Sequence, residues 1–131
     1  RMEIASLAKS QAEVPECIDN DETASLVACL VHARILLILT SVDGIYTDQS
    51  DPSTLIREIS GKDAYELVEN IENYKKYCEG ASRKGANGAK AKLEYIKQAA
   101  AQGTTVYIAN AKYPIRSILS GETECTTVRI R

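Results

Sequence analysis

The feature that most constrains this fold is the stretch at residues 35–47, ILLILTSVDGIYT. Its first five residues are all aliphatic, without alternation of apolar and polar side chains. Such a run is typical of a central parallel strand that helices cover on both faces. Polar and flexible residues follow it: Thr40, Ser41, Asp43 and Gly44. Because ligands bind outside the carboxyl ends of strands in open α/β sheets, we expect a site here.

The remaining chain alternates predicted helices with predicted strands. Apolar spacing predicts helices over about residues 19–33, 62–77, 89–102 and 114–119, with helical spacing also at residues 2–9. Strands are predicted over residues 55–59, 104–110 and 125–131. This order predicts an α/β layered sandwich with a mostly parallel sheet flanked by helices. A length of 131 residues fits a single domain, residues 1–131, with one core.

Composition excludes several classes of function. A net charge of -2 and a pI near 5.5 argue against a nucleic-acid partner, which would require a basic face. The four cysteines form no CxxC pair, which favours a reducing, cytoplasmic location. No apolar run approaches the roughly 20 residues that span a bilayer, so we expect no membrane partner and no signal peptide.

Besides the strand end, two stretches carry groups suited to ligand binding. Asp19, Asn20 and Asp21 precede a buried helix, where they could be ordinary N-caps or could hold a substrate or a cation. In residues 85–92, GANGAKAK, glycines come just before a helix whose N-terminal N–H groups and dipole favour an anion such as phosphate. The structural alternatives are a solvated lysine-rich face here and a plain turn at Asp43 and Gly44. The sequence leaves both alternatives open.

The common catalytic fingerprints are missing from the sequence. It has no Walker A pattern and no GxGxxG, so neither frequent nucleotide motif supports the phosphate interpretation. His32 is the only histidine, and its position predicts a helix C-terminal residue rather than a base. With no GxSxG either, a hydrolase that uses a nucleophilic side chain has no support.

Four segments, taken in order, resemble the amino-acid kinase family and, within it, the C-terminal, nucleotide-binding half of the glutamate 5-kinases. They are DNDETASLVACLVHA, LLILTSVDGIYT with its DP-containing loop and LIREI, GANGAKAKLEYIKQAAAQG, and VYIANAKYP. The family transfers the γ-phosphate of ATP to a carboxylate or phosphate acceptor. The resemblance therefore implies ATP, with Mg²⁺ carried by the nucleotide, a small amino-acid substrate and a homo-oligomer.

The resemblance also assigns roles to individual residues. It implies that Thr40 and Ser41 belong to the ATP site and that Asp43, Gly44 and Tyr46 shape the nucleotide loop. The residues implied to line the phosphates are Gly85, Ala86, Asn87, Gly88 and Lys92. Lys92 would also neutralise charge on the transferring phosphoryl group, and Asp21 would orient the catalytic lysines. Asp19 and Asn20 would contact the acceptor.

The chain also departs from the family pattern. Ala86, Asn87 and Ala89 replace the Thr, Gly and Met of the usual GTGGM loop, and Ser41 stands where glutamate 5-kinases commonly have Asp. The N-terminal half of the family fold has no counterpart here, so we expect this chain alone to be inactive. The implied acceptor is the γ-carboxylate of glutamate, in proline biosynthesis. The alternatives are a non-catalytic nucleotide-binding regulatory module and a uridylate kinase-like phosphate-acceptor kinase.

Overall fold

The structure, a computed structural model, describes residues 20–78 and 86–131. The side chains of Ala86 and Asn87 are not part of this description. The helical spacing at residues 2–9 and the candidate site residues Asp19 and Gly85 lie outside the described residues.

A mixed four-stranded sheet forms the centre of the described fold. Its strands are β1 (Ile35–Thr40), β2 (Glu58–Gly61), β3 (Thr105–Asn110) and β4 (Thr126–Ile130), in the spatial order β1-β3-β4-β2. The pairs β1–β3 and β4–β2 are parallel, and β3–β4 is antiparallel. This arrangement confirms the predicted α/β class with a mostly parallel sheet.

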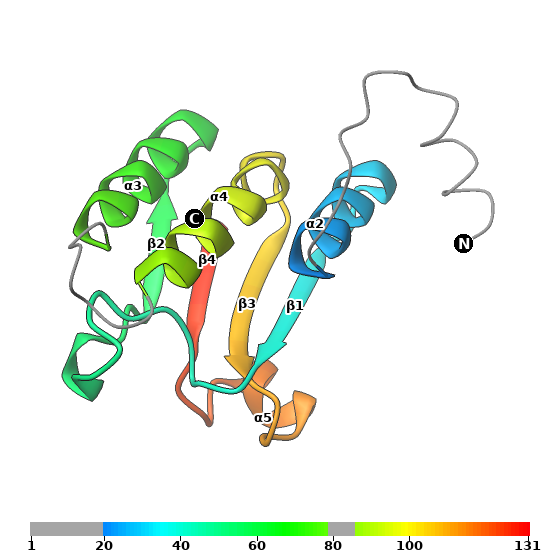
Figure 1. The fold of residues 1–131 in the computed structure, drawn as a ribbon. Coiled ribbons are helices and arrows are strands. Elements are labelled where there is room, and N and C mark those ends of the chain that lie inside the picture. Colours follow the sequence, from blue (N-terminus) through cyan, green and yellow to red (C-terminus); the bar gives the residue numbers. More distant parts are fainter. Residues whose placement is uncertain (1–19, 79–85) are drawn as a thin grey trace.

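The long helices gather on one face of the sheet (Figure 1). They are α2 (Asn20–Val31), α3 (Ala64–Tyr77) and α4 (Ala86–Ala101). The shorter α5 (Ile115–Ser120) lies at the end of the sheet where β1 and β3 finish, and η1 (Pro52–Thr54) is a single 3₁₀ turn. No helix in the described ranges is long and apolar enough to cross a membrane.

The core lies between these helices and the sheet. Apolar residues recur every three or four positions in α3 and α4, so each helix turns one stripe inward. Strand residues at every second position meet those stripes. The largest fully buried aliphatic side chains between the layers are Ile59, Leu67, Ile71, Leu93, Ile96, Val106, Ile108 and Val128.

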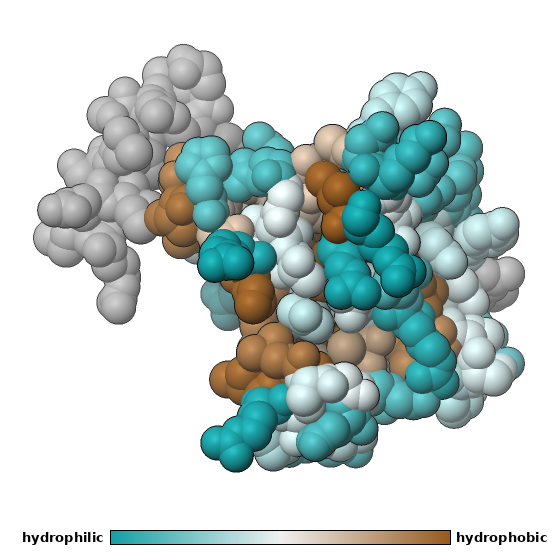
Figure 2. All heavy atoms as spheres, turned by 180° about the vertical axis from the view of Figure 1, so that it is seen from behind, coloured by the Kyte–Doolittle hydropathy of each residue, from teal (hydrophilic) through white to brown (hydrophobic). Residues whose placement is uncertain are grey.

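The prediction that residues 35–39 form a central strand covered on both faces is wrong for the described structure. Among the described strands, β1 lies at the edge of the sheet and pairs with β3 alone. Leu36 and Ile38 face the helices and are buried, whereas Ile35 and Leu39 point the other way and are 50% and 43% exposed. Figure 2 shows apolar side chains on this rear side of the molecule. A run of aliphatic residues indicates that burial of the strand is favourable, but it does not specify which elements cover each face.

Helix boundaries follow local capping chemistry. Asp63 accepts a hydrogen bond from the Glu66 N–H at 2.8 Å and so begins α3. His32 follows the last residue of α2 and, at φ 52°, adopts the left-handed conformation that ends many helices. This position agrees with its prediction as a helix C-terminal residue. The start of α4 also differs from its prediction, because the helix begins at Ala86 rather than near Ala89. Gly88 therefore lies in the first turn of α4.

The predicted strand at residues 55–59 is only partly correct. β2 covers Glu58–Gly61, while Leu55 makes a single antiparallel bridge to Tyr46. The described cysteines Cys29, Cys78 and Cys125 all carry free thiols.

Four alternating charges join α3 to α4. Lys97 Nζ lies 2.8 Å from Glu72 and 3.2 Å from Glu94, and Lys75 pairs with the same two carboxylates. The hydrogen bond from Lys97 is the main cause that lowers the pKa of Glu72, and that from Lys75 does the same for Glu94. Both carboxylates are therefore easier to ionise in the folded state.

We predict that Glu72→Gln destabilises the chain at neutral pH by roughly 1 kcal/mol or less, because the ion pairs of Glu72 with Lys75 and Lys97 are partly exposed. The folded pKa of Glu72 lies below its ordinary value of 4.5, so the stabilisation is present above that value and is lost as the pH falls through the folded pKa. Denaturant unfolding of wild type and variant from pH 7 downward should show the two curves converging under acidic conditions. Glu69→Gln, at an exposed position of the same helix, is the control. A stability difference that stays constant at every pH would contradict this account.

Candidate functional site

Two helix N-termini and one strand end meet at the same edge of the sheet. α2 leads into β1 through residues 32–34, and α4 leads into β3 through residues 102–104. Each helix therefore runs back along its strand, which brings its first turn to the carboxyl ends of the parallel pair β1–β3 (Figure 1). The polar residues after β1 lie at this same edge.

A cavity of about 150 Å³ lies at this edge. Residues 40–49, after β1, form one wall, and the first two turns of α4 form the other. Its lining includes the predicted site residues Thr40, Ser41, Gly44, Tyr46, Gly88 and Lys92. It also includes Ala89, from the predicted phosphate segment at residues 85–92, and Val42, Ile45 and Gln49, which were not predicted as site residues. Apolar residues such as Val42 and Ile45 carry no sequence signal that separates cavity lining from core.

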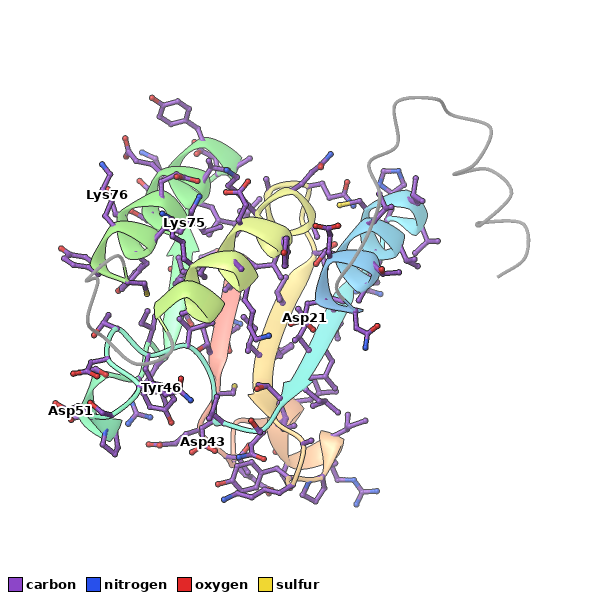
Figure 3. All side chains as sticks on the ribbon, in the orientation of Figure 1. Asp21, Asp43, Tyr46, Asp51, Lys75 and Lys76 are labelled. Carbon is purple, nitrogen blue, oxygen red and sulfur yellow. The ribbon has the colours of Figure 1, made fainter. Side chains whose placement is uncertain are left out.

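Lys92 is the one charged side chain among the described residues that line this cavity. It lies in the second turn of α4 and forms an ion pair with Asp21, in the first turn of α2. Both side chains are largely buried, with 27% and 20% of their surface exposed. Figure 3 shows Asp21 at the end of α2 that faces the site. The ion pair therefore fixes the ammonium group beside the cavity.

Asp43 does not line the cavity but supports the turn that does. The side-chain amide of Asn110, at the end of β3, donates to Asp43 Oδ1 at 3.2 Å and to the Ser41 carbonyl at 3.3 Å. The Asn110 Oδ1 accepts a hydrogen bond from the Lys112 N–H at 3.0 Å. Asn110 was not among the predicted site residues. The signal that could have indicated it is a polar amide side chain at the carboxyl end of a predicted strand.

Tyr46 connects the loop after β1 to the segments around Leu55 and Cys78. Its backbone bridges to Leu55, and its carbonyl accepts a weak hydrogen bond from the Cys78 thiol at 3.7 Å. Burial, followed by the negative charge of Asp43, raises the pKa of the Tyr46 phenol above its ordinary value. The phenol therefore stays protonated at neutral pH and can serve as a donor.

Among the described side chains, the predicted residue Asn20 does not line the cavity. Asn20 is exposed and begins α2. Ala86 and Asn87 contribute backbone to the first turn of α4, and their side chains are not described. In the described ranges, no group of three or more acidic, His or Cys side chains could hold a metal ion.

The cavity has the chemistry of an anion site. The first four N–H groups of a helix have no partner within that helix, and they concentrate partial positive charge at its N-terminus. The first turn of α4 carries no acidic residue, and one turn later Lys92 places an ammonium group, paired with Asp21, beside the cavity. A volume near 150 Å³ is below the roughly 300–1,000 Å³ of sites for drug-sized ligands. It suits a phosphate group with an adjoining part of a ligand rather than a whole nucleotide.

A larger cavity, of about 590 Å³, lies at the opposite edge of the sheet. It is lined by residues 32–35, 102–105 and 107, at the amino ends of β1 and β3. Ligands in open α/β sheets bind at the carboxyl ends of the strands, whereas this cavity lies at the amino ends of β1 and β3. The helix α3 also begins at this edge, but it follows β2, at the other side of the sheet from β1. Size alone therefore does not make it the better candidate.

Known structures share this fold. The carbamate kinase of Giardia lamblia bound to AMP-PNP superposes with a TM-score of 0.58 and 22% identity, over 86% of this chain and 32% of that one. The uridylate kinase of Archaeoglobus fulgidus superposes with a TM-score of 0.56 and 22% identity, over 99% of this chain and 57% of that one. At these identities the likeness concerns the fold alone.

Sequence relatives are more similar. A glutamate 5-kinase of Dehalococcoides mccartyi is 39% identical over 116 residues, which cover 82% of this chain and 28% of that enzyme. The glutamate 5-kinase of Clostridium perfringens is 36% identical over 108 residues, which cover 79% of this chain and 38% of that enzyme. The chain thus spans well under half the length of these curated relatives. A sequence profile of the amino acid kinase family matches residues 5–110, most of the chain, and the chain therefore belongs to the amino acid kinase family.

Proposed function

We propose that this chain is the ATP-binding portion of a kinase that phosphorylates a small carboxylate acceptor. The observation that carries the proposal is the cavity shared by Ser41, after β1, and Lys92, in α4. Strand-end hydroxyls and a helix N-terminus on opposite walls suit the phosphates of one nucleotide. The bound phosphates would occupy the cavity while the rest of the nucleotide extends beyond it.

In the proposed reaction, a carboxylate oxygen of the acceptor attacks the γ-phosphorus of ATP. The bond from that phosphorus to the β–γ bridging oxygen breaks, and ADP leaves with the electron pair. Lys92 lowers the energy of the transition state by balancing charge on the phosphoryl oxygens. Asp21 acts through Lys92, because the ion pair holds the ammonium group in one position. Mg²⁺ would arrive with the nucleotide.

We propose the γ-carboxylate of glutamate as the acceptor, which would place the kinase in proline biosynthesis. The support is the 39% identity to a glutamate 5-kinase, compared with 22% to the uridylate kinase. Asn20, which begins α2, and the preceding residue Asp19 are the proposed acceptor contacts, and a cytoplasmic homo-oligomer is the proposed form. Because the chain spans 28% of that relative, all of these belong to the proposal for a whole enzyme.

A second candidate is a nucleotide-binding module without turnover. The loop sequence favours it, because Ala86, Asn87 and Ala89 replace the Thr, Gly and Met of the usual family loop. Both candidates require nucleotide binding, and only the first requires phosphoryl transfer when an acceptor and any remaining part of the enzyme are present.

We predict that AMP-PNP with Mg²⁺ binds the 131-residue chain at one site. Titration calorimetry measures this binding, and a coupled assay for ADP with ATP and glutamate measures turnover in the same sample. Binding without ADP release is the expected result for this chain. Failure to bind at millimolar nucleotide would reject both candidates, and steady ADP release would reject the module.

We predict that Lys92→Met weakens AMP-PNP binding roughly tenfold to a hundredfold, because a charge-assisted hydrogen bond to phosphate is lost. The same change leaves the Asp21 carboxylate facing the site without its partner lysine, which adds repulsion. The double variant Asp21→Asn, Lys92→Met should therefore bind more tightly than Lys92→Met alone. Calorimetry on the three proteins measures both effects.

Lys76→Met is the matched control, because it removes the same charge from an exposed position on α3 (Figure 3). It should bind AMP-PNP as the unchanged chain does. Equal loss of affinity in Lys76→Met and Lys92→Met would mean that overall charge, rather than Lys92 at the cavity, controls binding.

A further inference from the structure

Thr126, the first residue of β4, contacts the loop that lines the candidate nucleotide cavity. Its side chain is fully buried, and its hydroxyl makes two hydrogen bonds. The Ile45 N–H donates to Thr126 Oγ1 at 2.8 Å, and that hydroxyl donates to the Ile56 carbonyl at 2.6 Å. One hydroxyl group of β4 therefore binds both Ile45 and Ile56, on the two sides of the loop between them.

The same point is fixed by backbone contacts. The Ile56 N–H donates to the Ile45 carbonyl at 2.8 Å, and the bridge between Tyr46 and Leu55 continues the pairing by one residue. Thr126 therefore completes a closed arrangement in which the Ile45 N–H and C=O both have partners. Such pairing gives the loop a single conformation, because a buried N–H without a partner is costly.

Gly44 shows how closely the loop approaches β4. A Cβ added at Gly44 would collide with Thr126 Oγ1 and would lie 2.9 Å from the Thr126 backbone nitrogen. Gly44 and Ile45 both line the cavity, and Ile45 is only 2% exposed. The threonine hydroxyl thus lies directly behind the cavity wall without lining the cavity itself.

We propose that Thr126 is a positioning residue, whose hydroxyl fixes the Gly44–Ile45 wall in the conformation that receives the phosphates. Its effect on nucleotide binding rests on the proposed function, whereas its effect on the loop does not. The neighbouring Thr127 is half-buried and does not bond to the loop in the described structure, so the role belongs to position 126.

The test compares Thr126→Val with Thr126→Ser in the full chain. Valine keeps the shape and removes the hydroxyl, which leaves the Ile45 N–H and the Ile56 carbonyl without this partner. Serine keeps the hydroxyl. We expect Thr126→Val to weaken AMP-PNP binding roughly fivefold or more and Thr126→Ser to restore most of it. Equal affinity of Thr126→Val and the unchanged chain would overturn the proposal.

Thr104→Val is the matched structural control. Thr104 is also a buried threonine, and its hydroxyl donates to the Ala33 carbonyl at 2.6 Å, at the opposite edge of the sheet. It should lower the thermal unfolding temperature without changing the affinity for AMP-PNP. If Thr104→Val weakens binding as much as Thr126→Val does, the effect is general destabilisation and the positioning role is wrong.

Hydrogen exchange of the Ile45 amide in the ligand-free chain separates this inference from the proposed function. Exchange should accelerate in Thr126→Val and stay slow in Thr126→Ser and Thr104→Val. That pattern without any AMP-PNP binding would reject the nucleotide function and retain the role in the loop. Unchanged Ile45 exchange in Thr126→Val would reject the role in the loop whether or not nucleotide binds.

If Thr126→Val does not fold, Gly44→Ala tests the same contact from the loop side. The added Cβ pushes the wall away from β4 and leaves Thr126 intact. We expect weaker AMP-PNP binding and faster Ile45 exchange in a folded protein. Normal binding with normal exchange in Gly44→Ala would overturn the proposal.

Discussion

Burial of one stripe of α4 against the sheet determines where the candidate site forms. Leu93, Ile96, Ala99 and Ala100 are all inaccessible to solvent, so this face of the helix has one orientation on the sheet. Each buried leucine or isoleucine contributes about 1.5–3 kcal/mol relative to exposure, far more than a partly exposed ion pair. Packing therefore sets the position of α4, and the polar groups of its first two turns are carried to the strand ends.

The polar contacts then refine that arrangement. The ion pair of Lys92 with Asp21 joins α4 to α2, and Asn110 and Thr126 hold the intervening loop from two neighbouring strands. None of these contacts could assemble the layers alone. Together they restrict the side chains and backbone groups around a small cavity, which is the preorganisation that binding of a charged group requires.

Local structure could be predicted from the sequence better than the tertiary contacts that surround each element. The apolar spacing in α3 and the glycine after α4 were sufficient to position those helices, and the polar residues from Thr40 onward indicated where a cavity lies. Gly88 was predicted to precede the helix, because the segment around it is rich in Gly, Ala and Lys and shows no apolar period, yet α4 begins at Ala86 and includes it. No local pattern specifies tertiary neighbours. The exposure of Leu39 depends on such neighbours, and so does the contact between Ile45 and Thr126, two residues that lie 81 positions apart in the sequence.

The central claim is that the end of β1 and the start of α4 hold one nucleotide together. Amide chemical shifts of the ¹⁵N-labelled chain, recorded while AMP-PNP and Mg²⁺ are added, test it directly. The account predicts that the largest changes fall on Ser41, Gly44 and Gly88, with one common dissociation constant. Changes concentrated around Gly103 and Thr105 at the opposite edge of the sheet, or separate constants for the two walls, would contradict it.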